Sequence, residues 1–362
     1  MHVAMVGTRG VPAQYGGFET AVEEIGRRLA ADGHRVVVYC RNPGQSQTEH
    51  LGMELVNLSA MRKRSLETLS HTGLSVSHAL RHRPDAAVLF NAGNAPYIPL
   101  LKAARIPTAV HVDGLEWKRA KWQGFGARYY RWAERAAARS GLPLIADAQG
   151  IADHLRVTYG ADSHVIAYGA PILDPASDRL AELGLTRGAY HLVVARLEPE
   201  NHVDVVVRGY AESGSPHPLV VVGSAPYGDA HVAEIRAAAG ESDTRFVGAV
   251  WDQDLLNELY AGSLSYLHGH SVGGTNPSLL RALGCAAPVT AFDVNFNREV
   301  TAGNARFFED PASVATAIRA DDQDPDGAAA RGAEGQRHAA ATYRWDDVAE
   351  AYLELLSGMV RR

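Results

Sequence analysis

A glycine-rich segment near the N-terminus has the composition of an anion-binding loop. Segment 7–19 reads Gly-Thr-Arg-Gly-Val-Pro-Ala-Gln-Tyr-Gly-Gly-Phe-Glu, and it follows the apolar run 2–6. In the next stretch, 20–30, apolar residues recur at helical spacing. A strand, a glycine-rich loop and a helix in this order direct backbone N–H groups toward an anionic ligand. A tight turn at positive φ would explain a single glycine. The pair Gly16-Gly17 favours close approach of a negatively charged ligand.

Arg196 and a second glycine pair, later in the chain, are also suited to binding an anion. Arg196 follows the apolar run 191–195, and its planar guanidinium suits phosphate oxygens. The alternative is a surface ion pair with Glu198 or Glu200. Segment 273–277, Gly-Gly-Thr-Asn-Pro, has the signals of a helix start, so its N–H groups can face an anionic ligand. A well-capped buried helix is the competing explanation.

Carboxylates follow the apolar run 108–112. Asp113 and Glu116 stand at its end, beside His111. A carboxylate placed there can act as a general acid or base. Glu116 and Lys118 could instead pair with neighbouring charges, and Trp117 and Trp122 could stack on a ligand or belong to the core.

We expect no metal site. Asp252 and Asp254 have the spacing of a metal-binding motif, but they stand at a predicted helix start, where the helix dipole favours acidic residues. No other group of His and carboxylate residues has metal-ligand spacing.

The elements that position these residues form two repeating α/β units. Continuous apolar runs alternate with helical patterns, which is typical of parallel sheets covered on both faces. The expected strands cover 2–6, 36–40, 86–90, 108–112 and 144–146, then 191–195, 218–223, 245–248, 264–268 and 288–292. Segment 320–337 is expected to be a loosely ordered connection, followed by a last helix over 348–359. We therefore predict domains at 1–171 and 172–340, with residues 341–362 crossing back to the first domain.

Composition narrows the function classes. The chain has 362 residues, 46% of them apolar, a net charge of -6 and a pI near 6.2. This balance argues against a nucleic-acid partner that needs a globally basic surface. Cys40 and Cys285 are too few for a disulfide framework. No apolar run has the length of a membrane span, so we expect a cytoplasmic protein, with at most peripheral membrane contact through basic surfaces such as 61–64.

Four segments resemble glycosyltransferase family 4 with its two-domain GT-B fold, and more narrowly its rhamnosyltransferase-type branch. They are segment 7–19, segment 111–122 (His-Val-Asp-Gly-Leu-Glu-Trp-Lys-Arg-Ala-Lys-Trp), segment 195–201 and segment 268–280, which contains His-Ser-Val-Gly-Gly-Thr-Asn-Pro. The second and fourth blocks are the specific ones, and the resemblance runs through nearly the whole chain.

The resemblance implies a retaining, metal-independent transfer of a sugar, a deoxyhexose such as rhamnose, from a dTDP-, UDP- or GDP-linked donor to a saccharide, lipid-linked or natural-product acceptor. The C-terminal domain is expected to hold the nucleotide and the N-terminal domain the acceptor. Expected catalytic residues are Asp113 and Arg196. The expected donor-binding residues are Gly16, Gly17, Arg196, Glu200, Asn201, His268, His270, Gly273, Gly274, Thr275, Asn276, Arg281 and Glu299. The expected acceptor-binding residues are Tyr15, Phe18, Glu19, His111, Glu116 and Lys118.

The chain departs from the family pattern at two places. Many members carry a lysine shortly after the arginine, whereas the matching stretch of this chain reads Glu200-Asn201-His202, so the second cation is missing. The family's Glu-x7-Glu signature, whose second glutamate bonds the ribose, falls on Gly273 and Arg281. Three further interpretations are therefore kept: lower activity, a different donor, or a catalytically impaired nucleotide-sugar-binding or partner-activating subunit. A sugar-nucleotide epimerase shares the fold. A pyridoxal-dependent phosphorylase does not fit, because no lysine follows Lys121.

Overall fold

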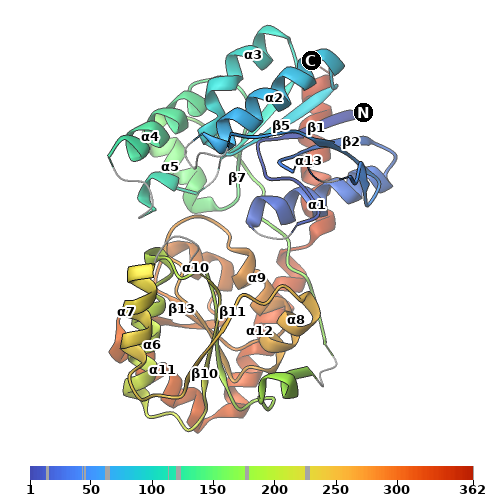
Figure 1. The fold of residues 1–362 in the computed structure, drawn as a ribbon. Coiled ribbons are helices and arrows are strands. Elements are labelled where there is room, and N and C mark those ends of the chain that lie inside the picture. Colours follow the sequence, from blue (N-terminus) through green and yellow to red (C-terminus); the bar gives the residue numbers. More distant parts are fainter. Residues whose placement is uncertain are drawn as a thin grey trace. The chain divides into compact units, whose positions relative to one another are not determined.

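The protein folds into two α/β units. The structure, a computed structural model, describes residues 1–13, 16–42, 44, 46–61, 66–112, 114–119, 124–175, 179–224 and 229–361. The first unit contains residues 1–169 and 345–362, and the second contains residues 170–344. Each is built around a largely or wholly parallel sheet with helices on both sides (Figure 1). The predicted fold class of two doubly wound domains is confirmed.

The first unit has an eight-stranded sheet in the order β3-β4-β2-β1-β5-β6-β7-β8. Neighbouring strands are parallel except for the pair β3 and β4. Residues of β1, β5 and β6 are almost completely buried, as expected of central strands covered on both faces. The strands are β1 (His2–Val6), β2 (Arg35–Cys40), β3 (Glu49–His50), β4 (Met53–Asn57), β5 (Ala86–Phe90), β6 (Thr108–Val112), β7 (Leu144–Ala146) and β8 (His164–Val165).

Helices cover the two faces of this sheet. Figure 1 shows α2 and α3 on one side and α1 with α13 on the other, and α1 packs against α13. Helix α1 buries the stripe formed by Val22, Ile25 and Leu29. The helices are α1 (Gly17–Ala31), α2 (Glu67–His82), α3 (Ile98–Ala103), α4 (Phe125–Ala138), α5 (Gln149–Tyr159) and α13 (Trp345–Val360), with the 3₁₀ turns η1 (Ala92–Tyr97) and η2 (Glu116–Lys118).

The second unit has a six-stranded parallel sheet in the order β11-β10-β9-β12-β13-β14. Val193, Val221 and Leu267 of its central strands pack in one apolar cluster with Val207 and Ile318 from the helices. The strands are β9 (His191–Val194), β10 (Leu219–Val222), β11 (Thr244–Gly248), β12 (Ser265–His268), β13 (Val289–Phe292) and β14 (Ala305–Phe308).

The helices of the second unit form two layers. Helix α6 contacts α7 and α11, while α9 contacts α8, α10 and α12. Figure 1 shows the first group on one side of the sheet and α8, α9 and α12 on the other. The helices are α6 (Val203–Ser213), α7 (Asp229–Ala239), α8 (Gln253–Gly262), α9 (Pro277–Gly284), α10 (Asn295–Thr301), α11 (Pro311–Gln323) and α12 (Pro325–Thr342), with the 3₁₀ turns η3 (Arg179–Leu183) and η4 (Pro199–Asn201).

The expectation of a loosely ordered connection over 320–337 is wrong. Helix α11 runs through residue 323, and α12 starts two residues later. The Asp324 side chain accepts from the Gly327 N–H, and Pro325 occupies the first helical position. Both features are helix-start signals, so the acidic and alanine-rich composition belongs to a helix pair and not to a linker.

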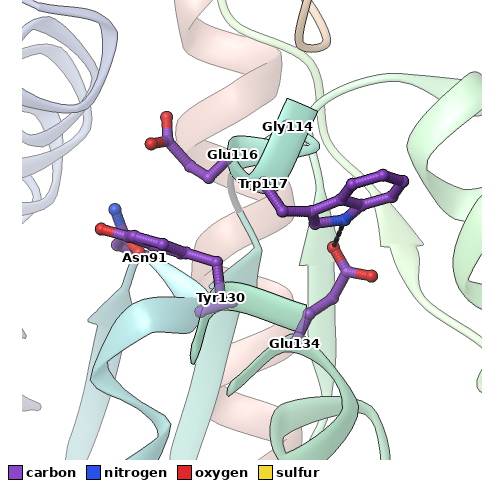
Figure 2. Close-up of a pocket in the computed structure, with 7 residues that line it drawn as sticks. Asn91, Gly114, Glu116, Trp117, Tyr130 and Glu134 are labelled. Carbon is purple, nitrogen blue, oxygen red and sulfur yellow. Dashed lines mark hydrogen bonds between the residues drawn. The ribbon is translucent and has the colours of Figure 1, made fainter. Parts of the chain in front are cut away.

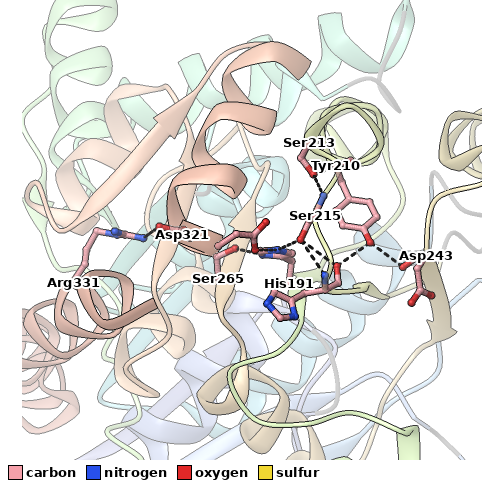
Figure 3. A network of polar contacts seen from close by, with 10 residues as sticks. His191, Tyr210, Ser213, Ser215, Asp243, Ser265, Asp321 and Arg331 are labelled. Carbon is pink, nitrogen blue, oxygen red and sulfur yellow. Dashed lines mark hydrogen bonds and ion pairs between the residues drawn. The ribbon is translucent and has the colours of Figure 1, made fainter. Parts of the chain in front are cut away.

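A buried polar network lies at the amino ends of the strands of the second unit (Figure 3). His191 begins β9, and its Nδ1 lies 2.8 Å from the Ser265 hydroxyl. Its Nε2 lies 3.0 Å from the Ser215 hydroxyl and 3.1 Å from the Asp322 carboxylate. Although this is a Ser-His-Asp set, Ser265 is completely buried, and in open α/β sheets ligands bind at the carboxyl ends of the strands. The network therefore holds α11 and the 215–217 turn to the sheet.

Asp321, the residue before Asp322, anchors a second group of polar side chains. It is fully buried and accepts from Arg306 at 3.1 Å and from Arg331 at 2.7 Å. These pairs join β14, α11 and α12. Among the residues the structure describes, no helix is long and apolar enough to cross a bilayer, and no group of three or more His, Cys, Asp or Glu side chains is placed to hold a metal ion.

Candidate active site

In the second unit, the ends of β9 and β12 bring together Arg196, Asn201 and His270. Asn201 Nδ2 donates to the carbonyl oxygen of Arg196 at 2.7 Å, and Asn201 Oδ1 lies 2.7 Å from His270 Nδ1. Because Nδ2 must face the carbonyl, Oδ1 faces the imidazole and can only accept. His270 therefore carries its hydrogen on Nδ1. Asn201 is buried, so this small side chain ties two neighbouring loops together.

The Arg196 side chain is about one-third exposed, and one of its terminal nitrogens lies 3.3 Å from Glu198 Oε2. The surface ion pair considered as the alternative to phosphate binding therefore exists. A pair of this exposure contributes little to stability, so an incoming anion loses little by displacing it.

Asn297 holds the His270 segment from the other side. This buried amide, on α10, donates to the carbonyls of His270 at 2.9 Å and Phe292 at 2.8 Å. Of this stretch the sequence pointed only to Glu299, because the role of Asn297 depends on the distant His270 carbonyl.

His268 has a different environment from His270. It is buried at the end of β12, and its Nδ1 lies 3.0 Å from the Tyr266 hydroxyl. Burial lowers the pKa of His268 to about 3, so the imidazole is neutral at physiological pH. Its Nε2 has no hydrogen-bond partner among the described residues. His268 can therefore contact a neutral group but cannot supply positive charge to a phosphate.

The predicted helix start at 273–277 is confirmed. Gly273 has a φ of 129°, and Asn276 is the N-cap of α9, where its side chain accepts from the Ser278 N–H at 2.9 Å. Pro277 follows at the first helical position, and Thr275 is buried. Gly274 lies between Gly273 and the N-cap Asn276 in the sequence. The N-terminus of α9 is thus close in sequence to His270, and its dipole favours an anion.

Arg281, at the position of the family's second glutamate, belongs to α9 and donates to Gln253 Oε1 at 2.8 Å. Asp252 caps the start of α8 by accepting from the N–H groups of Asp254 and Leu255, each at 3.1 Å. The interpretation of the Asp252–Asp254 pair as helix-start charges is therefore confirmed.

Glu200 and Glu299 lie in contrasting positions. Glu200 is buried in η4, and its backbone oxygen accepts from the Ser271 N–H at 3.0 Å. Neither carboxylate oxygen of Glu200 has a hydrogen-bond partner among the described residues. Glu299 is exposed on α10, where the neighbouring Arg298 pairs with Asp293 at 2.5 Å.

In the first unit, the glycine-rich loop is held in place by Glu19, a residue of the same segment. Glu19 accepts from the backbone N–H of Arg9 at 3.0 Å, and burial raises the pKa of the Glu19 carboxyl. Gly16 is the N-cap of α1 with a φ of 111°, and Gly17 begins the helix. A Cβ on Gly16 would collide with the Glu19 carboxylate. Glu19 therefore has a structural role in the loop, besides any contact with an acceptor.

His111 lies in the core of the first unit. It is completely buried, and its ring packs edge-on against Phe18 at 5.1 Å and lies 5.3 Å from Phe90. Its Nδ1 lies 2.7 Å from the Tyr352 hydroxyl of α13. Burial lowers the pKa of His111 to about 3, so the ring is neutral. The structure thus gives His111 and Phe18 packing roles at the end of β6.

A small cavity adjoins the turn after β6 (Figure 2). It has room for about one water molecule, which is too small for a sugar. Glu116 is buried at one side of this cavity. Its Oε1 lies 2.7 Å from Arg119 Nε, so the pairing of neighbouring charges that was the alternative to acceptor binding occurs. The remaining lining residues are Asn91, Ala92, Gly114, Trp117, Tyr130 and Glu134.

Glu134, which the sequence did not bring to attention, anchors the wall of this cavity. This buried α4 carboxylate accepts from Trp117 Nε1 at 3.3 Å and from the Tyr159 hydroxyl at 2.8 Å, and it lies 2.8 Å from His154 Nε2. Figure 2 shows the Trp117 indole directed at Glu134 and the Glu116 carboxylate directed away. Trp117 is therefore part of the packed wall, and Lys118 is exposed beside it. Asp113, Tyr15, Lys121 and Trp122 lie outside the described residues.

Comparison with known proteins places this geometry in context. Residues 16–169 match the family model of the glycosyl transferase 4-like domain. A search of curated proteins finds no match.

Solved structures resemble the chain over both units. Sucrose-phosphate synthase from Thermosynechococcus elongatus has a TM-score of 0.85 at 19% identity, covering 99% of this chain and 98% of that one. Anabaena Alr3699/HepE in complex with UDP has a TM-score of 0.79 at 18% identity, covering 99% and 100%. WaaG, a glycosyltransferase involved in lipopolysaccharide biosynthesis, has a TM-score of 0.74 at 18% identity, covering 98% and 100%. At these identities the likeness establishes the fold, which is GT-B.

Proposed function

We propose that this chain, a glycosyltransferase with the GT-B fold, transfers a sugar from a nucleoside-diphosphate donor held by its second unit to an acceptor held by its first. The transfer retains the anomeric configuration and needs no metal ion. The acceptor is a saccharide, a lipid-linked sugar or a natural product. In this proposal the second unit is the donor domain and the first unit is the acceptor domain, as the sequence led us to expect.

The observation that carries the proposal is the Asn201 bridge between Arg196 and His270. Arg196 and the N-terminus of α9 supply positive charge and N–H donors at the carboxyl ends of neighbouring strands, where ligands of α/β sheets bind. His270, held by Asn201 with its hydrogen on Nδ1, adds a second polar side chain to the site. Together they can take over the role of the missing lysine in balancing a diphosphate.

These groups support the chemical step by stabilising the leaving group. As the bond between the anomeric carbon and the diphosphate breaks, negative charge grows on the phosphate oxygens, and fixed donors placed there lower the barrier. The departing phosphate can take the proton of the acceptor hydroxyl. We assign Asp113 to the orientation of that hydroxyl, on the basis of its place after β6.

The donor sugar is proposed as a deoxyhexose such as rhamnose, with dTDP-rhamnose as the first candidate. Support comes from the blocks 111–122 and 268–280, which resemble the rhamnosyltransferase-type branch. The Anabaena HepE structures were determined with UDP and with UDP-glucose. UDP-linked hexoses are therefore the first competitors to test.

Arg281 supports a second candidate function. A guanidinium at the position of the ribose-binding glutamate inverts the charge there, and Arg281 is bonded to Gln253 within its own unit. A chain that binds a nucleotide sugar without transferring it, and activates a partner, would be compatible with this change.

The test is a thermal-shift and calorimetric panel of dTDP, UDP, GDP and their sugars, run without metal and with EDTA. A ligand at about 100 times its Kd adds about 2.7 kcal/mol to the free energy of unfolding. Selective binding of dTDP or dTDP-rhamnose, lost in Arg196→Ala and kept in the control Arg245→Ala, is expected. Binding without transfer to any acceptor would favour the second candidate. No binding of any nucleotide would overturn the donor site.

A further inference from the structure

Helix α4 exposes two large aromatic side chains on one side. Phe125 is 83% exposed and Trp132 is 53% exposed. They are seven residues apart, which is close to two helical turns, so they lie on the same face. Burying such side chains is favourable, and an aromatic pair left in water on a helix surface indicates a binding face.

Basic residues surround this pair without acidic partners. Arg128, Arg131, Arg135 and Arg139 are all exposed, and none forms an ion pair with another residue that the structure describes. The one acidic residue of α4 is the buried Glu134 on the other side of the helix.

Two lysines from neighbouring segments extend the basic area. Lys102 donates to the Ser140 carbonyl just beyond α4 at 2.6 Å, and Lys118 lies 5.5 Å from the Trp117 ring, over which Arg131 also stacks at 4.7 Å. We call this set the α4 surface: Lys102, Lys118, Phe125, Arg128, Arg131, Trp132, Arg135 and Arg139. Its positive charge contrasts with the net charge of -6 of the whole chain.

We propose that the α4 surface binds the headgroup region of an anionic lipid bilayer. Exposed aromatic rings insert at the boundary between headgroups and acyl chains, and arginines beside them pair with lipid phosphates. A symmetric contact with a second copy of the chain would place these unpaired arginines against one another, which is unfavourable. Charge complementarity therefore selects an anionic partner, and the aromatic pair selects one with an apolar layer beneath its charges.

The opposite side of the same helix lines the small cavity after β6. Tyr130 and Glu134 of α4 line the cavity beside Glu116. A helix with its side chains is about 10–12 Å across, so a bilayer on the α4 surface would lie roughly that far from the loop after β6. This arrangement suits a lipid-linked acceptor. The link to the acceptor rests on the proposed function, whereas the lipid binding does not.

The experiment is co-sedimentation of the full chain with vesicles of phosphatidylcholine, with and without 30 mol% phosphatidylglycerol, at low and high salt. We expect binding to the anionic vesicles only, weakened by salt. Each arginine close to an anionic surface changes partitioning roughly fivefold, so the double variant Arg135→Gln/Arg139→Gln should bind roughly 25-fold more weakly. Phe125→Ser/Trp132→Ser should also lose binding, because it removes the inserted groups.

Matched controls lie in the second unit. Arg337→Gln and Trp251→Ser alter an exposed arginine and an exposed tryptophan, and both should bind vesicles like the unaltered chain. All variants should keep nucleotide-induced thermal stabilisation, which separates this proposal from the donor-site assignment. The proposal is overturned if anionic vesicles fail to sediment the chain, if the α4 variants bind them unchanged, or if the α4 variants change oligomeric state without lipid.

Discussion

The imidazole of His270 donates through Nδ1 to Asn201 Oδ1 at 2.7 Å, and the same asparagine donates to the backbone carbonyl of Arg196 at 2.7 Å. Two loops that follow neighbouring strands are thus held by one buried amide. The resemblance to glycosyltransferase family 4 implies a lysine in this stretch, where this chain has Asn201. Asn201 supplies an orienting contact in place of a charge, so the positive charge for a diphosphate is expected to come from Arg196.

Asn201→Ala should therefore weaken nucleoside-diphosphate binding, although the alanine removes no charge. Loss of two buried hydrogen bonds, each worth about 1 kcal/mol, predicts a fall in affinity of at least about tenfold. Isothermal calorimetry with the preferred nucleotide measures it. Asn304→Ala removes an amide that donates to the nearby Thr301 carbonyl in the same unit, and it should bind normally. Equal affinities in the two variants would contradict the positioning role.

Arg281→Glu should strengthen nucleotide binding. The substitution restores the carboxylate that the family pattern places against the ribose, and a charge-assisted hydrogen bond can improve affinity by roughly tenfold. Arg281→Gln removes the positive charge without supplying a carboxylate, so it separates the two effects. Weaker binding by Arg281→Glu would show that this chain uses the guanidinium itself.

The free energy of unfolding should fall as the pH falls below about 6.5. Burial lowers the pKa of His111 and His268 to about 3 and that of His71 to about 4, whereas an unfolded histidine titrates near 6.5. Below pH 6.5 the unfolded chain binds protons that the folded chain does not. Each such histidine then costs up to about 1.4 kcal/mol per pH unit until its folded pKa is reached.

Urea unfolding at several pH values between 7 and 4.5 measures this slope. His111→Phe should flatten it, because phenylalanine fits the aromatic surroundings of Phe18 and Phe90 and does not titrate. A substitution of the exposed His164 is the matched control. An unchanged slope in His111→Phe would mean that this histidine does not stay neutral in the fold.

Glu134→Gln should lower the free energy of unfolding by about 1–3 kcal/mol. The amide can no longer accept from Trp117, Tyr159 and His154 together, so at least one buried donor loses its partner. Urea unfolding measures the change. Glu350→Gln, on an exposed position of α13, should shift the free energy by less than about 0.5 kcal/mol. Equal stability of the Glu134 variant and the parent would argue against the anchoring role.

The central strands could be predicted from the sequence because each is a continuous apolar run. The residues of β5 and β6 are all buried, as in strands covered on both faces, and such a run is legible in the sequence. Strand β4 was missed because only Met53 and Leu55 are buried, with Glu54 exposed between them. Strand β14 was missed because its residues are mostly half-buried and Arg306 interrupts the apolar run.

The site residues also differ in whether the sequence could predict their roles. Asn276 and Pro277 were predictable, because a cap acts on its own helix and its signal is local. Glu134 and Asn297 were not, since each acquires its role from partners far along the chain, such as Tyr159 or the His270 carbonyl. The burial of His111 was equally hidden, because Tyr352 lies 241 positions later.

The place of Tyr352 has a consequence for biosynthesis. Helix α13 belongs to the first unit, where it packs on α1, β5 and β6, yet it is made after all of residues 170–344. While the ribosome synthesises residues 170–344, the second unit can complete its sheet, but the first still lacks the helix that contributes Tyr352 to His111. Domains commonly fold in the order of synthesis. In this protein the first unit can be completed only after the second has been made.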